Sequence, residues 1–221
     1  PTNRPLQRHW AGERLFSTAD EKWDAVVERI AGLHARGRPV LVGTRSVSAS
    51  ELLSGKLNAA GIPHVILNAR QDKEEADIVS KAGQPGRVTV ATNMAGRGTD
   101  IKLLPEVAKA GGLHVLATER HEAGRIDRQL YGRSGRQGDP GSFETVASLE
   151  DDLLTTSRRL LWRWMARALV RRGKPLQGKL AAFLVRQAQL SAESLHVRIR
   201  RDLLQHEDQL ETSLAFSGRL E

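Results

Sequence analysis

Residues 87–101 read Arg-Val-Thr-Val-Ala-Thr-Asn-Met-Ala-Gly-Arg-Gly-Thr-Asp-Ile, an apolar run followed at once by a glycine-rich turn. The run contains β-branched residues between turn-forming residues, which predicts a buried strand. Gly96 and Gly98 let the backbone approach a ligand closely, and Arg97 between them offers a planar guanidinium that suits phosphate oxygens. Asp100 adds an acceptor for a ribose hydroxyl or an arginine. The stretch predicts a ligand-binding loop after a strand; an ordinary surface turn is the alternative.

The alternation of strand and helix continues on both sides of this stretch. Short apolar runs predict the strands, and the pairs Thr18–Glu21 and Ser48–Glu51 predict capped helix starts. This alternation implies right-handed crossovers and a parallel sheet with helices on both faces, an α/β fold. After an extended first segment, the expected strands span residues 39–43, 64–67, 87–91, 113–117 and 143–147, and the expected helices span residues 19–35, 48–61, 73–82 and 121–130.

The pattern changes near residue 149, after which no strand is expected. Apolar residues recur every three or four positions from Leu180 to Leu203, which predicts one long amphipathic helix. Residues 158–172 predict a shorter basic amphipathic helix. Its apolar face is expected to pack on the sheet domain, with binding to anionic lipid as the alternative. We therefore expect an α/β domain over residues 1–152 and an all-helical tail over residues 153–221.

Composition limits the classes of protein that fit. With no cysteine, disulfides and thiolate metal sites are excluded, and a reducing compartment is expected. No apolar run approaches about 20 residues and no signal peptide is visible, so a soluble, cytoplasmic chain is expected. His114 lies in an expected strand and is interpreted as a packed core histidine. The chain opens at Pro1 without methionine, as expected of a trimmed piece.

The positive charge is concentrated in the tail. Residues 158–201 contain twelve Lys and Arg residues and one acid, Glu193, which gives this segment +11 against +8 for the whole chain. The rest of the sequence therefore sums to −3. Because the sheet domain is not basic and shows no aromatic stacking platform, nucleic acid is not an expected partner.

A second glycine-rich string, Gln-Leu-Tyr-Gly-Arg-Ser-Gly-Arg-Gln-Gly-Asp, spans residues 129–139. Its Arg133 and Arg136 lie three residues apart, on one side of a helical turn. Placed against another domain's nucleotide, such arginines stabilise a transferred phosphoryl group and contribute on the order of 10³–10⁵ in rate. A solvated basic helix end is the alternative. Both arginine strings are expected at the same edge of the sheet, where the carboxyl ends of parallel strands gather.

These two strings resemble motifs V and VI of superfamily-2 helicase motors, and the segments between them are similar to SecA in particular. Tyr131 and Gly124 depart from the resemblance, because that family commonly has arginine at both positions. The likeness covers residues 1–152, and the tail resembles the start of SecA's helical scaffold only loosely. The SecA-like segments are residues 1–5, 39–44, 67–69, 112–122, 125–127 and 148–152.

The resemblance implies a RecA-like second motor domain, partner of a first RecA-like domain that holds the Walker motifs. The implied nucleotide contacts are Gly96, Arg97, Gly98, Asp100 and Gln129, and the implied arginine fingers are Arg133 and Arg136. The implied links between the nucleotide site and domain motion are Glu119, Arg120, His121 and Arg125.

The implied function is that of a SecA-type ATPase. ATP or ADP with Mg²⁺ would bind between the two motor domains, and hydrolysis would drive a preprotein through the SecY channel. The implied location is the cytoplasm, peripherally attached to the inner membrane, with anionic lipid a possible partner of the basic tail. Since the sequence has no G-x-x-x-x-G-K-[ST] loop, the chain alone is not expected to hydrolyse ATP. The alternatives are half of a superfamily-2 nucleic-acid helicase and a SecA-derived, non-enzymatic adaptor.

Overall fold

The computed structural model describes residues 5–67, 72–92, 100–156, 160–171 and 173–217. Within them, a seven-stranded sheet in the order β3-β4-β2-β5-β6-β1-β7 forms the centre of the molecule. Neighbouring strands run parallel, except that β7 is antiparallel to β1. The strands are β1 (Gln7–Phe16), β2 (Val40–Thr44), β3 (Val65–Leu67), β4 (Val88–Thr92), β5 (Leu113–Ala117), β6 (Pro140–Ser148) and β7 (Leu176–Gln177).

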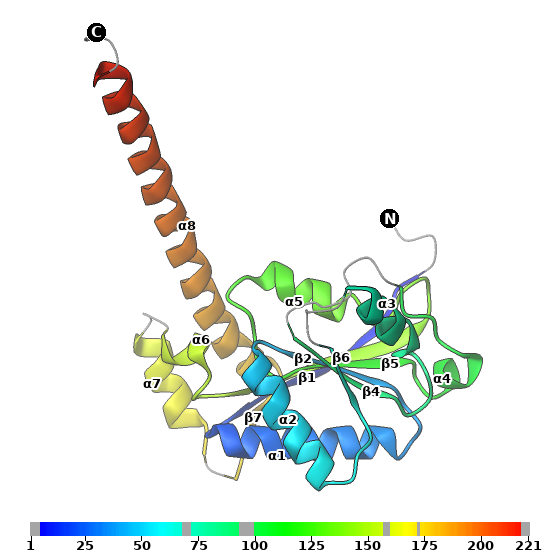
Figure 1. Ribbon diagram of the computed structural model, residues 1–221. Coiled ribbons are helices and arrows are strands. Elements are labelled where there is room, and N and C mark those ends of the chain that lie inside the picture. The colour runs from blue at the N-terminus through cyan, green and yellow to red at the C-terminus, as the bar shows by residue number, and fades with distance from the viewer. Residues whose placement is uncertain (1–4, 68–71, 93–99, 157–159, 172, 218–221) are drawn as a thin grey trace.

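Helices cover both faces of the sheet, as expected. In Figure 1, α1 and α2 lie below the strands and α3 and α5 above them, while α8 rises out of the body to the left. The helices are α1 (Ala19–His34), α2 (Val47–Ala59), α3 (Asp72–Lys81), α4 (Pro105–Lys109), α5 (Gly124–Tyr131), α6 (Asp152–Thr155), α7 (Leu160–Leu169) and α8 (Lys179–Ser217).

Two hydrophobic clusters bind these helices to the sheet. The α1–α2 face is built on large buried side chains such as Ile30, Leu53 and Leu57, all with no exposed area. The opposite face packs Leu130 and Tyr131 of α5 against alternate residues of the central strands. Each such side chain contributes about 1.5–3 kcal/mol when fully buried. Since every residue of β2, β4 and β5 is buried, their continuous apolar runs were readable in the sequence.

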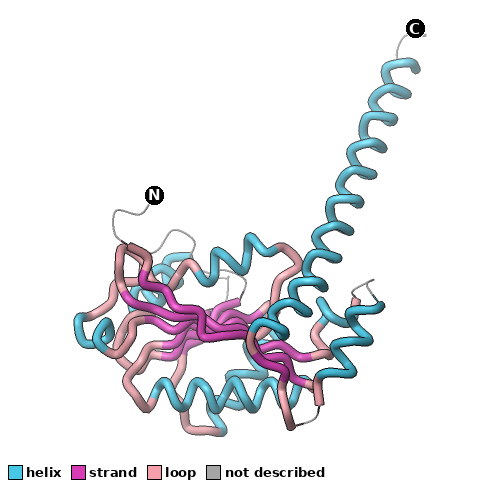
Figure 2. Tube along the Cα trace, turned by 180° about the vertical axis from the view of Figure 1, so that it is seen from behind, coloured by secondary structure: helices cyan, strands magenta, loops and turns pink. Residues whose placement is uncertain are grey.

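A third cluster joins the tail to the sheet. Leu15 of β1 meets buried residues of α6 and α7, and Leu184 and Ala188 of α8 complete the contact. Further along α8, Ile199 is 45% exposed and Leu203 is 58% exposed. The predicted apolar stripe of this helix therefore packs on the body only over its first half, and the second half extends beyond it (Figure 2).

The first strand, β1, was missed by the sequence analysis, which expected only an extended segment. It pairs in parallel with β6 over almost its whole length, with a register shift between Trp10 and Gly12. Most of its residues are polar or only partly buried, and its buried apolar side chains are Leu15 and Phe16. Its Glu13 and Arg14 form ion pairs with Arg120 and Glu144 instead, so no apolar run marked the strand. The two-residue β7 likewise falls where no strand was expected.

Three helix starts refine the predictions. Thr18 caps α1 by accepting from the Glu21 N–H at 3.3 Å, as predicted, but the Glu21 carboxylate accepts from the Gly173 N–H instead of completing a capping box. Ser46, not Ser48, caps α2. Helix α5 begins three residues later than expected, at Gly124.

In α7, Ala166 is buried as expected of a face packed on the body, whereas Trp164 is 69% exposed.

Candidate functional site

The loop that carries Arg133 and Arg136 lies at the amino end of β6. Helix α5 starts after the carboxyl end of β5 and returns across the sheet, so residues 132–139 lead directly into the start of β6. Gly135, at φ 64°, packs so closely on β1 that a Cβ there would lie 2.7 Å from the Arg8 Cβ. The expectation that this loop occupies the carboxyl edge was therefore wrong.

Asp100 and Arg136, which belong to the two separate glycine-rich strings, form an ion pair. One Asp100 carboxylate oxygen lies 3.2 Å from an Arg136 guanidinium nitrogen, and the other accepts from the Gln137 side-chain amide at 2.8 Å. Arg136 also donates to the Gly132 carbonyl at 2.9 Å. The ion pair is 35% exposed at the arginine and 40% exposed at the aspartate. It is thus held by directed bonds while still open to solvent and to a ligand.

Arg133 belongs to the same electrostatic group. Burial and the neighbouring Arg136 lower the pKa of its guanidinium, while Asp100 raises it. An arginine remains protonated at any physiological pH despite such a shift. The guanidinium groups of Arg133 and Arg136 therefore both lie near the Asp100 carboxylate, and such groups suit phosphate oxygens. The donor set of this cluster fits the nucleotide that the sequence implied.

Gln137 was not among the predicted site residues. It has φ 52°, and it is the one non-glycine residue in the left-handed region among the residues described. That conformation costs a non-glycine residue roughly 1–2 kcal/mol. Gly135 and Gly138 in the same turn also have positive φ, and the Gln137 side-chain amide donates to Asp100. The hint in the sequence was its place between two glycines of a tight turn.

The remaining predicted residues are not brought into this cluster. Gln129 lies on the exposed side of α5, and no hydrogen bond found among the described residues joins it to Asp100, Arg133 or Arg136. The other three predicted contacts, Gly96, Arg97 and Gly98, lie outside the described residues.

The opposite end of α5 carries a buried polar network. Glu13 of β1, with no exposed area, receives two hydrogen bonds from Arg120, at 2.5 and 3.1 Å. Asp127 accepts from both the backbone N–H and the ring of His121, at 3.0 and 2.8 Å. Burial alone would lower the pKa of Arg120, but Tyr131, Glu13 and Asp127 outweigh it and raise that pKa. Burial raises the pKa of the Glu13 carboxyl, and Arg120, bound to it in a bidentate pair, opposes that rise.

Helix α8 joins this network through Gln189, another residue with no exposed area. Its amide nitrogen donates to the His121 carbonyl at 2.8 Å and to Asp127 at 2.7 Å. We call Glu13, Arg120, His121, Asp127 and Gln189 the anchor network. Sequence reasoning singled out Arg120 and His121 but not their partners.

The two departures from the family resemblance have structural roles. Tyr131 is buried, stacks on Phe143 with 4.5 Å between ring centroids, and shares a hydrogen bond with Thr145 at 2.8 Å. It therefore packs in the core of the sheet. Gly124 lies against α8, where an added Cβ would come within 3.0 Å of an Arg186 nitrogen.

His114 is buried with no exposed area, as the core interpretation predicted. Arg38 donates to the Ser142 hydroxyl, which donates to one ring nitrogen of His114, and the other ring nitrogen donates to Glu144 at 2.9 Å. Burial lowers the pKa of His114, so the ring is neutral. Burial alone would raise the pKa of Glu144, but His114 and Arg29 lower it to about 2.

The part of the chain that the structure describes holds neither a cluster of metal ligands nor a membrane-spanning helix. No group of three or more His, Cys, Asp or Glu side chains there could hold a metal ion. None of the helices in the described part is both long and apolar enough to cross a membrane.

Comparison with known proteins identifies the family. The family model described as "SecA P-loop domain" matches residues 5–106 and 103–170. The chain is 50% identical to "Protein translocase subunit SecA 2" of Bordetella avium over 99% of its own length and 33% of that protein. It is 49% identical to "Protein translocase subunit SecA" of Oleidesulfovibrio alaskensis over 94% of its length and 24% of that protein. The chain thus spans at most a third of the length of these curated relatives.

The fold has solved neighbours among helicase motors. The "Mss116p DEAD-box helicase domain 2 bound to an RNA duplex" superimposes with a TM-score of 0.51 at 16% identity, covering 83% of this chain and 69% of that one. At this identity the likeness concerns the RecA-like fold alone. The match of the family model, which spans most of the chain, is decisive: the chain belongs to the SecA P-loop domain family.

Proposed function

We propose that the chain is the second motor domain of a SecA-like ATPase that drives preproteins through the SecY channel. The observation that carries this proposal is the Asp100–Arg136 pair beside Arg133, at the end of α5 in a chain of the SecA family. Guanidinium groups held in this way can neutralise the charge that develops on a phosphoryl group in transfer.

The proposed site is shared between two motor domains. ATP with Mg²⁺ supplies the phosphoryl group, and a first motor domain outside this chain holds both the metal and the phosphate loop. Arg133 and Arg136 act as arginine fingers, while Asp100 orients Arg136 through the ion pair at 3.2 Å. The further proposed contacts to the nucleotide are Gly96, Arg97, Gly98, Asp100 and Gln129.

The proposal divides the chain into a motor domain, residues 1–152, and the beginning of a helical scaffold, residues 153–221. The partners would be the first motor domain, the SecY channel and a preprotein, at the cytoplasmic side of the inner membrane. Anionic lipid is a further proposed partner of the tail. In support, Trp164 of α7 is 69% exposed, next to a segment rich in arginine.

The test is ATP hydrolysis by the longer protein, or by this chain supplied with the first motor domain of that same protein. Wild type is compared with Arg136→Ala and Arg97→Ala, with and without membrane vesicles that contain the SecY channel. We expect hydrolysis only when both motor domains are present, a collapse in the arginine variants, and stimulation by the channel.

Two other outcomes would contradict the proposal. Stimulation by single-stranded RNA or DNA in place of the channel would indicate half of a nucleic-acid helicase. Absence of hydrolysis in the reconstituted protein, with both domains folded, would indicate a non-enzymatic adaptor.

A further inference from the structure

The first turn of α5 is completed by another helix. Its N-cap residue, Ala123, has no side chain that could accept from the free N–H groups of the turn. The Gly124 N–H instead donates to the Glu193 carboxylate of α8 at 2.7 Å. Helix starts need such an acceptor because their first N–H groups lack partners within the helix. Glu193 therefore caps α5 from a position 69 residues along the chain.

Gln189, one turn earlier on α8, also joins α8 to the start of α5, but as a hydrogen-bond donor. It is fully buried, and its amide nitrogen reaches both the His121 carbonyl and the Asp127 carboxylate. Its amide oxygen accepts from Arg186 at 2.9 Å, so both ends of the side chain are bonded. Separating α8 from α5 would leave these buried groups without partners, which is more costly than losing an exposed bond.

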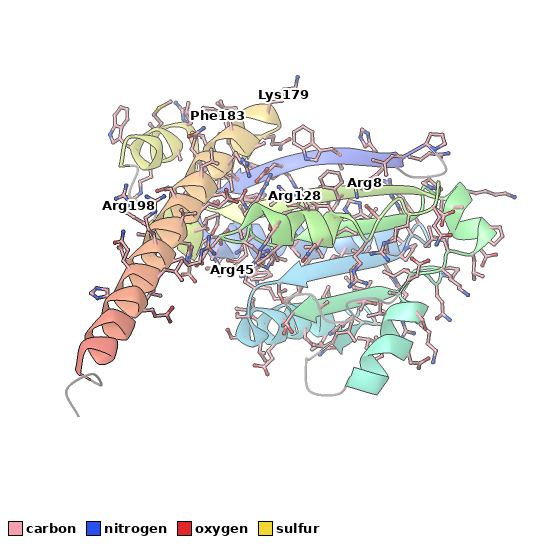
Figure 3. All side chains as sticks on the ribbon, turned by 90° about the horizontal axis from the view of Figure 1, so that it is seen from above. Arg8, Arg45, Arg128, Lys179, Phe183 and Arg198 are labelled. Atoms are coloured by element: carbon pink, nitrogen blue, oxygen red, sulfur yellow. The ribbon has the colours of Figure 1, made fainter. Side chains whose placement is uncertain are left out.

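Beyond Glu193, α8 reaches the segment before α5 through an exposed pair, in which His196 lies 2.6 Å from the Glu122 carboxylate. An open cleft of about 790 Å³ lies between α8 and α5, with Arg128 on the α5 side and Val197 and Arg200 on the α8 side. All three side chains are exposed. Among the described residues, the printed bonds from α8 thus reach the first turn of α5 and the residues just before it, with open space on the outer side. Figure 3 shows α8 crossing the end of the sheet beside α5, on which Arg128 is labelled.

We propose that α8 controls the position of α5, with Glu193 and Gln189 as positioning residues. Through α5 it also controls the position of residues 132–139, the arginine loop. A tilt of α8 into the cleft would carry the first turn of α5 with it. The loop that follows the other end of the same eight-residue helix bears Arg133 and Arg136. The regulatory meaning of this coupling rests on the proposed function, whereas the coupling itself concerns this chain alone.

The first test is hydrogen exchange of the backbone amides of this chain. Glu193→Ala removes the cap, and Gln189→Met replaces the buried amide by an apolar side chain of similar length. The matched control is Ser194→Ala, because Ser194 is exposed and its hydroxyl bonds only to Ser191 of the same helix. Glu193→Gln keeps an acceptor oxygen and should rescue the cap.

We expect amides 121–127 to exchange about tenfold faster in Glu193→Ala and Gln189→Met, with those of α1 unchanged. Ser194→Ala and Glu193→Gln should behave as wild type. Unchanged exchange at residues 121–127 would overturn the proposal. An equal acceleration along the whole chain in both variants would also overturn it, since that is the result of a purely structural role.

The second test uses ATP hydrolysis by the longer protein. Glu193→Ala should lower kcat several-fold while the KM for ATP stays within about twofold, because the proposed phosphate loop and metal site lie in the first motor domain. Rescue by Glu193→Gln is required, and failure of that rescue would overturn the proposal. If Arg136→Ala abolishes hydrolysis but Glu193→Ala does not change kcat, the regulation by α8 is wrong and the proposed function stands. If hydrolysis is absent in wild type, the proposed function fails while the exchange data still decide the coupling.

Discussion

The two ends of α5 are built on opposite principles. At its carboxyl end, half-exposed charges stand on a glycine turn that holds Gln137 at φ 52°. At its amino end, the anchor network is buried, and Glu13 and Gln189 have no exposed area. The carboxyl end presents charged side chains and a strained turn at the surface. The amino end is fixed to the body by buried hydrogen bonds. The difference teaches that one short helix can be rigid where it is attached and chemically open where it acts.

The largest expected effect falls on the open end. Arg133→Ala should lower ATP hydrolysis by the longer protein by about 10³-fold or more, because a cation facing the phosphoryl group is lost. The unfolding free energy of the chain should change little. The matched control is Arg128→Ala, since Arg128 lies on the exposed side of α5. Equal losses of kcat in both variants would contradict the proposed contrast.

The anchored end should respond in stability. Arg120→Met leaves the Glu13 carboxylate buried without its partner, so the unfolding free energy should fall by about 3–5 kcal/mol. Urea-induced unfolding followed by circular dichroism measures this. The double variant Glu13→Leu with Arg120→Met removes both charges and should recover much of the loss. If Arg120→Met costs less than about 1 kcal/mol, the network does not anchor the helix.

Low pH should destabilise the fold by protonating buried groups such as Glu144, on the face of the sheet that α1 covers. Its pKa is lowered from 4.5 to about 2, so its contribution to stability is complete above pH 4.5 and is lost as pH falls toward 2. The loss amounts to about 3 kcal/mol. Burial lowers the pKa of His114 from 6.5. As pH falls below 6.5, the unfolded chain therefore takes up a proton at this ring before the folded chain does. His114 should thus begin to destabilise the fold at a higher pH than Glu144 does. Unfolding of wild type and Glu144→Gln between pH 7 and pH 3 checks the sign, and the variant should lose the steeper, more acidic part of the dependence.

The smallest effect concerns the strained turn. Gln137→Gly should be more stable than Gln137→Ala by about 1 kcal/mol, because glycine adopts positive φ without strain. Both variants lose the bond to Asp100, so they form a matched pair for that contact. Thermal unfolding of the two variants is the measurement. A more stable alanine variant would show that the turn is not strained.

The same contrast explains what the sequence could reveal. Asp100, Arg133 and Arg136 were predictable because each lies in a short glycine-rich string whose composition is unusual by itself. Glu13 was not, because β1 lacks an apolar run and was not recognised as a strand. Gln189 and Glu193 looked like ordinary polar residues of an amphipathic helix. Their partners lie 62 to 69 residues away, and only the packed chain brings them together.

The fold was predictable where burial was continuous. The central strands β2, β4 and β5 were found because all their residues are buried, and the α/β order followed from them. The edge of the sheet on which the arginine loop lies was predicted wrongly. The sequence analysis assigned all loops with unusual residues to the carboxyl ends of the strands. The helix of residues 124–131 crosses the sheet first, and so places the loop that follows it, with Arg133 and Arg136, at the other edge.

The length of α8 has a mechanical consequence. The helix continues for 24 residues beyond Glu193, to Ser217, which corresponds to about 36 Å of lever arm. Its two bonds to α5 come from positions four residues apart, about 6 Å along the same axis. A sideways force at the far end would therefore reach those bonds multiplied about sixfold, and a tilt of about 5° would displace the tip by about 3 Å. A weak force on the far end of α8 can thus strain the bonds at the first turn of α5.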